Sequence, residues 1–168
     1  MTIRQANEND IAAIRSIYAP YVEQTAVSFE YEVPSLAEME RRFRHVTEQY
    51  PWLVAEDTEG NVVGYAYGCR FMQRAAYQWC AELAIYVDRN VRRSGVGSRL
   101  YEELISRLRR QGLVNLYACI AYTAEADEYL SNDSMHFHER MGFRKNAHFA
   151  RCGKKFGRWY DMIWMEKE

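Results

Sequence analysis

The sequence predicts a single α/β domain, of the α+β kind, built on a mixed sheet. The chain has 168 residues, and residues 1–168 are the length of one domain. Short apolar segments alternate with segments whose apolar residues recur at helical spacing. Some neighbouring strands are joined by a tight turn, whereas others are separated by a helix. This order predicts a central sheet of about seven strands flanked by about four helices.

The first half of the chain predicts three strands and two helices. Asp10 is placed to cap a helix that kinks or ends at Pro20. Ser35 and Glu38 match a capping box and begin a second helix, which runs to about residue 48. The three strands are expected at 3–6, 52–56 and 62–67, the last two joined by a turn at 57–61.

The second half predicts four more strands and two more helices. A helix begins at Ser94 and stops at Gly112. Another begins at Ser131 or Asn132 and ends before Gly142. The strands are expected at 83–87, 113–121, 143–150 and 159–165.

The overall composition argues for a soluble protein without a nucleic-acid or membrane partner. The net charge is −1, with 48% hydrophobic and 27% charged residues. No segment approaches the ~20 apolar residues of a membrane span, and the first residues resemble no signal segment. A cytoplasmic location is expected. No metal is expected, because the four cysteines have no zinc-ligand spacing: Cys69, Cys80, Cys119 and Cys152.

The segment from Arg92 to Gly97 has the features of an anion site. A strand ends at Val87, a basic turn follows, and two glycines, Gly95 and Gly97, begin a helix. The first N–H groups of a helix have no partner within the helix and attract a phosphate. A Walker loop is excluded because no Gly-Lys-Ser/Thr follows. A dinucleotide fingerprint would need a third glycine where Leu100 stands.

The spacing Arg92-x-x-Gly95-x-Gly97 resembles the signature of the GNAT superfamily of N-acetyltransferases. Within it the chain is most similar to the phosphinothricin and methionine sulfoximine acetyltransferase group. The segments 28–30, 74–82, 137–143 and 155–161 carry this resemblance, which covers nearly the whole chain. It implies the GNAT fold and acetyl-CoA as the co-substrate, and it also implies a homodimer. The implied cofactor-binding residues are Ile85, Tyr86, Val87, Arg92, Arg93, Ser94, Gly95, Val96, Gly97, Ser98, Ser131, Asn132 and Ser134.

The sequence departs from the group where the last of these residues lie. Relatives carry an asparagine three residues before a serine at this helix start. Counting back from Ser134, that position is Ser131, and the asparagine is displaced to Asn132. The segment 125–130 before it looks inserted, so either residue is a candidate for the cofactor contact.

Acetyl transfer to an amine needs a neutral nucleophile, and Glu82 is the candidate general base. It is expected at the head of the strand 83–87, on the same face as Ala84 and Tyr86. Burial there would raise the pKa of its carboxyl group. A structural hydrogen bond is the alternative role. His138 stands where many relatives have a tyrosine and is a candidate general acid or a packed side chain.

The acceptor side is less well defined by the sequence. Arg74 precedes Glu82 closely enough to bind a carboxylate or phosphinate with both guanidinium branches. Six Lys and Arg residues between 144 and 158, without an acid, are candidates for attracting anions or form a solvated surface. The other candidate substrate-binding residues are Phe29, Glu30, Tyr77 and Phe156.

We therefore expect an enzyme that moves an acetyl group from acetyl-CoA to the primary amine of a small amino-acid-like substrate. Transfer is expected to be direct, because no cysteine stands where a nucleophile would be needed. An acetyltransferase for a protein N-terminus or a polyamine is the alternative enzyme. A non-catalytic CoA-binding module is the alternative from another class.

Overall fold

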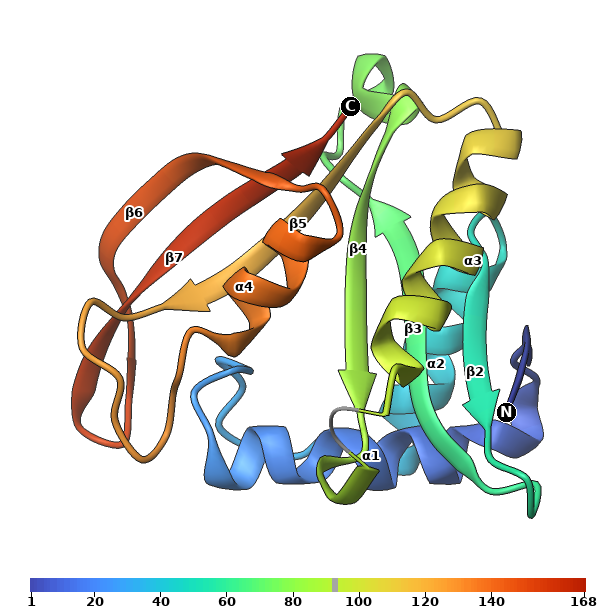
Figure 1. Cartoon of the computed structure of the whole chain (residues 1–168), viewed down its shortest axis with the longest axis horizontal. Coiled ribbons are helices and arrows are strands. Elements are labelled where there is room, and N and C mark those ends of the chain that lie inside the picture. Colours follow the sequence, from blue (N-terminus) through green and yellow to red (C-terminus); the bar gives the residue numbers. More distant parts are fainter. Residues whose placement is uncertain (92–93) are drawn as a thin grey trace.

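A computed structural model of the protein describes residues 1–91 and 94–168. Within these residues there are seven strands, four α-helices and three short 3-10 helices (Figure 1). The strands are β1 (Thr2–Gln5), β2 (Trp52–Glu56), β3 (Val62–Arg70), β4 (Cys80–Val87), β5 (Asn115–Tyr122), β6 (Arg144–Lys155) and β7 (Arg158–Lys167). The helices are α1 (Ile11–Gln24), α2 (Leu36–Thr47), α3 (Val96–Arg110) and α4 (Asp133–Arg140), with η1 (Glu8–Asp10), η2 (Ala75–Trp79) and η3 (Arg89–Val91).

All seven strands form one mixed sheet, as the sequence predicts, and their order in it is β1-β2-β3-β4-β5-β7-β6. Every neighbouring pair is antiparallel except β4 and β5, which are parallel. The pairing of β4 with β5 covers Cys80↔Asn115, Ala81↔Leu116 and Glu82↔Tyr117. Figure 1 shows the two strands separating beyond this point, with α4 drawn beside the opening. The sheet is therefore interrupted immediately after Glu82.

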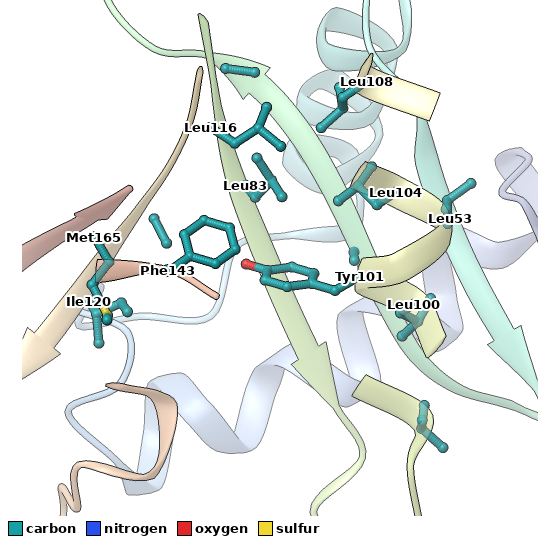
Figure 2. Packing of buried hydrophobic residues seen from close by; sticks show 14 of the residues in the cluster. Leu53, Leu83, Leu100, Tyr101, Leu104, Leu108, Leu116, Ile120, Phe143 and Met165 are labelled. Atoms are coloured by element: carbon teal, nitrogen blue, oxygen red, sulfur yellow. The ribbon is translucent and has the colours of Figure 1, made fainter. Parts of the chain in front are cut away.

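One face of the sheet packs against α3, whose apolar residues recur at helical spacing. Leu100, Leu104 and Leu108 are fully buried where α3 packs against β2, β3 and β4 (Figure 2). Glycine on β3 permits this close approach, because a Cβ atom at Gly68 would lie 2.9 Å from Cδ2 of Leu108. The core thus fixes α3, and with it the glycine turn at its start, against the centre of the sheet.

The other face packs against α1 and α2 through aromatic rings. Trp52 stacks on Tyr67 with ring centroids 4.0 Å apart, and Tyr86 contacts Tyr18 and Tyr21 edge-on. The helix α1 does not end at Pro20, which was one of the two expected outcomes, because it continues to Gln24. Residues on both sides of Pro20, such as Ile17 and Tyr21, are buried. Their packing outweighs the ~3 kcal/mol that a proline costs inside a helix.

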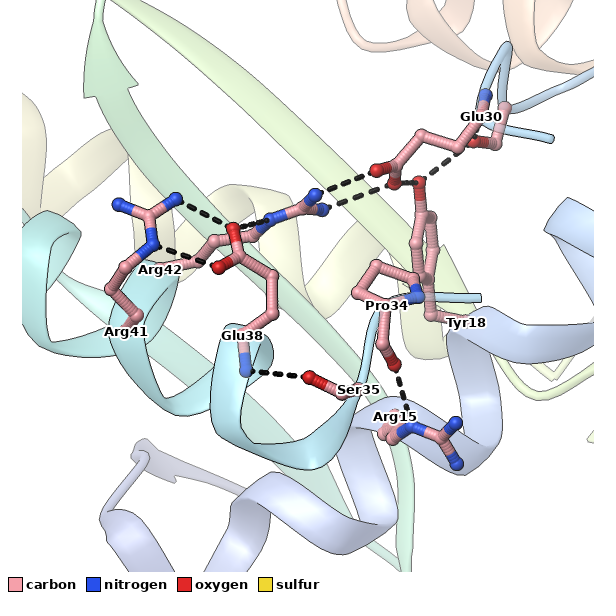
Figure 3. Close-up of polar contacts among 9 residues, drawn as sticks. Arg15, Tyr18, Glu30, Pro34, Ser35, Glu38, Arg41 and Arg42 are labelled. Atoms are coloured by element: carbon pink, nitrogen blue, oxygen red, sulfur yellow. Dashed lines mark hydrogen bonds and ion pairs between the residues drawn. The ribbon is translucent and has the colours of Figure 1, made fainter. Parts of the chain in front are cut away.

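Local capping follows the sequence only in part. The Ser35 hydroxyl accepts the Glu38 N–H at 3.1 Å, as predicted. The Glu38 carboxylate does not reach back, however, since it binds the guanidinium groups of Arg41 and Arg42 (Figure 3). Asp10 does not cap α1 through its side chain, because that carboxylate accepts the N–H of Asn7, the residue before η1, and pairs with Arg4.

The closing hairpin is longer than the sequence predicts. β6 extends to Lys155 because irregular pairing between Phe149 and Gly153 lets the strand bend and continue. Arg151, within this irregularity, has a positive φ of 47°. No helix of the described residues is long and apolar enough to cross a membrane.

Candidate active site

A cavity of about 360 Å³ lies where β4, the start of α3 and the start of α4 meet. Gly95 caps α3 with a φ of +79°, a left-handed conformation that glycine adopts without strain. A Cβ atom at Gly97 would lie 3.2 Å from the Phe137 ring, so this glycine brings α3 close to α4. The cavity gathers most of the predicted cofactor-binding residues: Ile85, Tyr86, Val87, Ser94, Gly95, Val96, Gly97, Ser98, Ser131 and Ser134.

The remaining predicted cofactor-binding residues lie elsewhere. Arg92 and Arg93 are outside the described residues. Asn132 does not line the cavity, because its amide group binds both backbone polar groups of Thr123, at 3.3 and 2.8 Å. Ser131 lines it instead. The displaced asparagine therefore ties the start of α4 to the end of β5, and the serine faces the cavity.

A second cavity of about 180 Å³ adjoins the first one. The two share lining residues on β4, on the loop after α1 and on α4, namely Ile85, Tyr86, Val27 and Ser134. The smaller cavity reaches along β4 to Glu82 and across to His138 and Tyr101. A molecule lying along the larger cavity can thus present one end to Glu82.

Glu82 lies within β4, directly across the antiparallel pair from Cys69. Burial raises the pKa of the Glu82 carboxyl group, and the Cys69 thiol, 3.9 Å from its Oε2, partly opposes this shift by donating a hydrogen bond. Burial, reinforced by Glu82, raises the pKa of the Cys69 thiol to about 12, so the thiol remains a donor at neutral pH. A carboxylate with a raised pKa is a stronger base, which favours the predicted role of Glu82.

His138 is 2% exposed and forms a buried pair with Tyr101. Burial lowers the pKa of His138 to about 4, so the imidazole is neutral at neutral pH. Its Nδ1 lies 2.7 Å from the Ser134 carbonyl oxygen, which can only accept, so Nδ1 carries the proton. Nε2 therefore accepts the Tyr101 hydroxyl at 2.7 Å. In this arrangement His138 has no free proton to donate, and a role in proton transfer would have to pass through Tyr101.

Tyr101 was not among the site residues predicted from the sequence. The available signal was its position on the core-facing stripe of the helix 94–110, between Leu100 and Leu104. A tyrosine buried there needs a partner for its hydroxyl group. The partner, His138, is 37 residues away in the chain, so spacing alone could not reveal it.

The predicted substrate-binding residues do not line the cavity that contains Glu82. Arg74 lines a separate cavity of about 540 Å³ together with Arg70. Tyr77 is 43% exposed and lies edge-on to Phe71. Within one chain, the structure therefore does not bring Arg74 and Tyr77 to Glu82.

The other three predicted substrate-binding residues, Phe29, Glu30 and Phe156, contact neighbouring segments and line neither of the two adjoining cavities. The Glu30 carboxylate is bound by both branches of the Arg42 guanidinium, at 2.6 and 3.0 Å, and by the Tyr18 hydroxyl (Figure 3). Phe29 packs over Gly153, and Phe156 stacks on Tyr129 with ring centroids 4.0 Å apart. Two residues near them do line the Glu82 cavity: Val27, in the loop before Phe29, and Leu130, next to Tyr129.

The basic stretch is largely neutralised or covered locally. Arg144 pairs with Glu166, and Arg158 pairs with Asp127 and Glu128. Arg151 and Lys154 both lie over the Trp159 ring, 5.3 and 5.4 Å from its centroid. Lys155 is buried. None of the six cations lines either of the two adjoining cavities.

Comparison with known proteins identifies the family. The model of the acetyltransferase (GNAT) domain matches residues 3–164. The chain belongs to the GNAT acetyltransferase family. This confirms the resemblance stated above, the fold class and the assignment as an acetyl-CoA-dependent N-acetyltransferase.

Several relatives match over nearly their whole length. The phosphinothricin N-acetyltransferase of Streptomyces viridochromogenes is 34% identical over 99% of this chain and 86% of its own. The L-methionine sulfoximine/L-methionine sulfone acetyltransferase of Pseudomonas paraeruginosa is 32% identical over 98% of this chain and 92% of its own. The crystal structure of a GNAT superfamily phosphinothricin acetyltransferase from Sinorhizobium meliloti, in complex with AcCoA, has a TM-score of 0.90 at 34% identity, covering 99% of this chain and 86% of that one.

Proposed function

We propose that this enzyme transfers the acetyl group of acetyl-CoA to the primary amine of a small amino-acid-like substrate resembling phosphinothricin or methionine sulfoximine. The observation that carries the proposal is the junction of the two cavities at β4. The larger cavity suits an elongated thioester whose pyrophosphate binds at the start of α3. The smaller one contains the carboxylate of Glu82 with a raised pKa. The relatives that act on such substrates support the substrate class.

In the proposed reaction, Glu82 accepts a proton from the substrate ammonium group, directly or through water. The neutral amine nitrogen then forms a bond with the thioester carbonyl carbon, and the carbon–sulfur bond breaks. Backbone groups of β4, around Ile85 and Val87, bind the cofactor arm, and a backbone N–H of this strand stabilises the oxyanion. As the amide forms, the nitrogen loses its second proton, and the leaving thiolate takes up that proton directly or through water. The reaction proceeds in a ternary complex without a covalent enzyme intermediate.

The assignment of Glu82 is tested with Glu82→Gln, which preserves the shape of the side chain and removes its basicity. We expect kcat to fall by ~10²-fold or more at neutral pH, while acetyl-CoA affinity is retained. Glu59→Gln is the control, because Glu59 is an exposed glutamate in the turn after β2. An unchanged rate in Glu82→Gln would refute the assignment of the base.

The substrate class is tested by following thiol release from acetyl-CoA with a panel of amines. Phosphinothricin, methionine sulfoximine, common amino acids, spermidine and a peptide with a free N-terminus form the panel. Preference for the first two supports the proposal. Turnover of spermidine or the peptide alone would favour the alternative enzymes. Tight acetyl-CoA binding with no turnover would favour a non-catalytic CoA-binding module.

We further infer that the enzyme is cytoplasmic, as the scattered cysteines and the first residues indicate, and that it is a homodimer, as its resemblance to the group implies. All residues from 72 to 79 are exposed, and this segment includes large apolar side chains at Met72, Tyr77 and Trp79. Such an exposed apolar segment is characteristic of an interaction surface. Light scattering of the purified protein tests the dimer, and a monomer at all concentrations would contradict it. Neither a nucleic acid nor a membrane is part of the proposal.

A further inference from the structure

The charged group of Lys155 is buried and forms no ion pair with a carboxylate among the described residues, although the Glu30 carboxylate is near enough to oppose the lowering of its pKa by burial. The side chain lies at the end of β6 and only 5% of the residue is exposed. Its Nζ donates to two backbone carbonyl oxygens, those of Val22 and Ser28, each at 2.7 Å. A buried ammonium group is retained only where such bonds compensate for lost hydration. These contacts therefore indicate what Lys155 does.

The two carbonyl groups lie on either side of a short segment, residues 22–28, that ends α1 and enters the following loop. Val22 is in the last turn of α1, where carbonyl groups have no partner within the helix and carry the negative end of its dipole. Ser28 lies in the loop, on the other side of Val27. A single cation thus links both ends of the segment to the closing hairpin.

Val27 is the part of this segment that reaches the active site. Its side chain lines the larger cavity and also the cavity that contains Glu82. The adjacent Ala26 is fully buried and donates its N–H to the Tyr129 carbonyl at 3.0 Å. The position of the segment 22–28 therefore sets the wall at the junction of the two cavities.

Further contacts join the same loop to the same hairpin. Phe29 lies so close to Gly153 that a Cβ atom there would be 2.5 Å from the ring. The Tyr31 hydroxyl donates to the Lys154 carbonyl at 2.5 Å. On its other side the loop is held by the pairing of Glu30 with Arg42 (Figure 3). The loop is thus fixed between α2 and the β6–β7 hairpin, and Lys155 is its buried contact on the hairpin side.

We propose that Lys155 is a positioning residue for the amine acceptor, which holds the segment 22–28 so that Val27 closes the wall beside Glu82. The inference rests on the proposed function of the Glu82 cavity. Lys155 touches neither substrate in this proposal. It acts through the carbonyl groups of Val22 and Ser28, and its effect is on acceptor binding rather than on the chemical step.

The variant Lys155→Met tests this, because methionine keeps most of the side-chain length and removes the ammonium group. If the loop then adopts its binding-competent position about one tenth of the time, the apparent KM for the amine rises about tenfold. We expect a much smaller change in the KM for acetyl-CoA, because most residues that line its proposed cavity belong to β4, the start of α3 and the start of α4. Lys154→Met is the matched control. The Lys154 side chain is exposed, and the residue's hydrogen bond with the loop is made by its backbone carbonyl group, which the substitution keeps.

Hydrogen exchange supplies a readout that does not depend on activity. Amides of residues 22–31 should exchange faster in Lys155→Met than in the wild type, whereas those of α3 should not. Gly153→Ala gives a second route to the same loop if Lys155→Met fails to fold. Its added methyl group would displace the Phe29 ring, and a raised acceptor KM is again expected.

An unchanged acceptor KM together with unchanged exchange of residues 22–31 in a folded Lys155→Met would overturn the inference. A fall in kcat with no change in acceptor KM would also overturn it. These outcomes differ from a failure of the proposed function. In that case the wild-type protein would acetylate no amine, while the exchange of residues 22–31 would still report whether Lys155 holds the loop.

Discussion

Removing the Tyr101 hydroxyl should destabilise the protein through a single buried hydrogen bond. Tyr101 is fully buried, and its partner His138 is 2% exposed. Tyr101→Phe preserves the packing of the ring but leaves the Nε2 acceptor of His138 without its donor. Leaving a buried polar group unsatisfied costs about 1–3 kcal/mol. In a domain of this size each kcal/mol lowers Tm by about 2–4 °C, so we expect a decrease of at least about 2 °C.

Urea unfolding of Tyr101→Phe, His138→Phe and the double variant measures this contribution. Replacing both partners with apolar groups removes the unsatisfied acceptor, so Tyr101→Phe should cost less in the His138→Phe background. The difference between the two costs is the coupling energy of the pair. Wild-type stability in Tyr101→Phe would refute the reasoning, because it would mean that His138 does not depend on this donor.

The same variant separates a structural from a catalytic role. If the pair only joins α3 to α4, kcat of the folded Tyr101→Phe enzyme should remain close to the wild-type value. If the Tyr101 hydroxyl supplies a proton to the leaving thiolate, kcat should fall by ~10²-fold or more. Measuring kcat well below the Tm of the variant keeps the two effects apart.

Three further predictions concern the base, the cofactor turn and acid stability. Cys69→Ala removes the hydrogen bond that lowers the pKa of Glu82, so the rising limb of kcat/KM against pH should move to higher pH; a limb at the wild-type pH would contradict this contact. Gly95→Val should abolish acetyl-CoA binding in calorimetry. Gly60→Val, with a similar φ of +84° in an open turn, should retain it. A hydrogen bond from Arg4 lowers the pKa of the Asp10 carboxyl group in the folded protein. The ionised carboxylate therefore stabilises the fold above its unfolded pKa of 3.8, and this contribution is lost as the pH falls through the lower folded value. In Asp10→Asn, the free energy of unfolding measured in urea should depend less on pH at the acid end.

The sequence by itself determined the sheet-and-helix order, the turn at Gly95 and the family. Each of these depends on local pattern. Alternating apolar residues define strands, helical spacing defines α3, and two glycines at a helix start define an anion site. Glu82 could be selected because a carboxylate inside an otherwise apolar strand is unusual wherever the strand lies. The residues around Glu82, including Cys69 on the neighbouring strand β3, could not be predicted in this way.

Only the tertiary structure decided which side chains surround Glu82. Tyr101 on α3 contacts His138 on α4, and Lys155 contacts Ser28, which is 127 residues away in the chain. Arg74 is close to Glu82 in sequence, but it lines a different cavity because η2 and the first residues of β4 separate the two. α1 continues through Pro20 because its neighbours are buried. In each case the outcome depends on how strands and helices cross, and crossing brings together residues whose separation in the chain carries no local pattern.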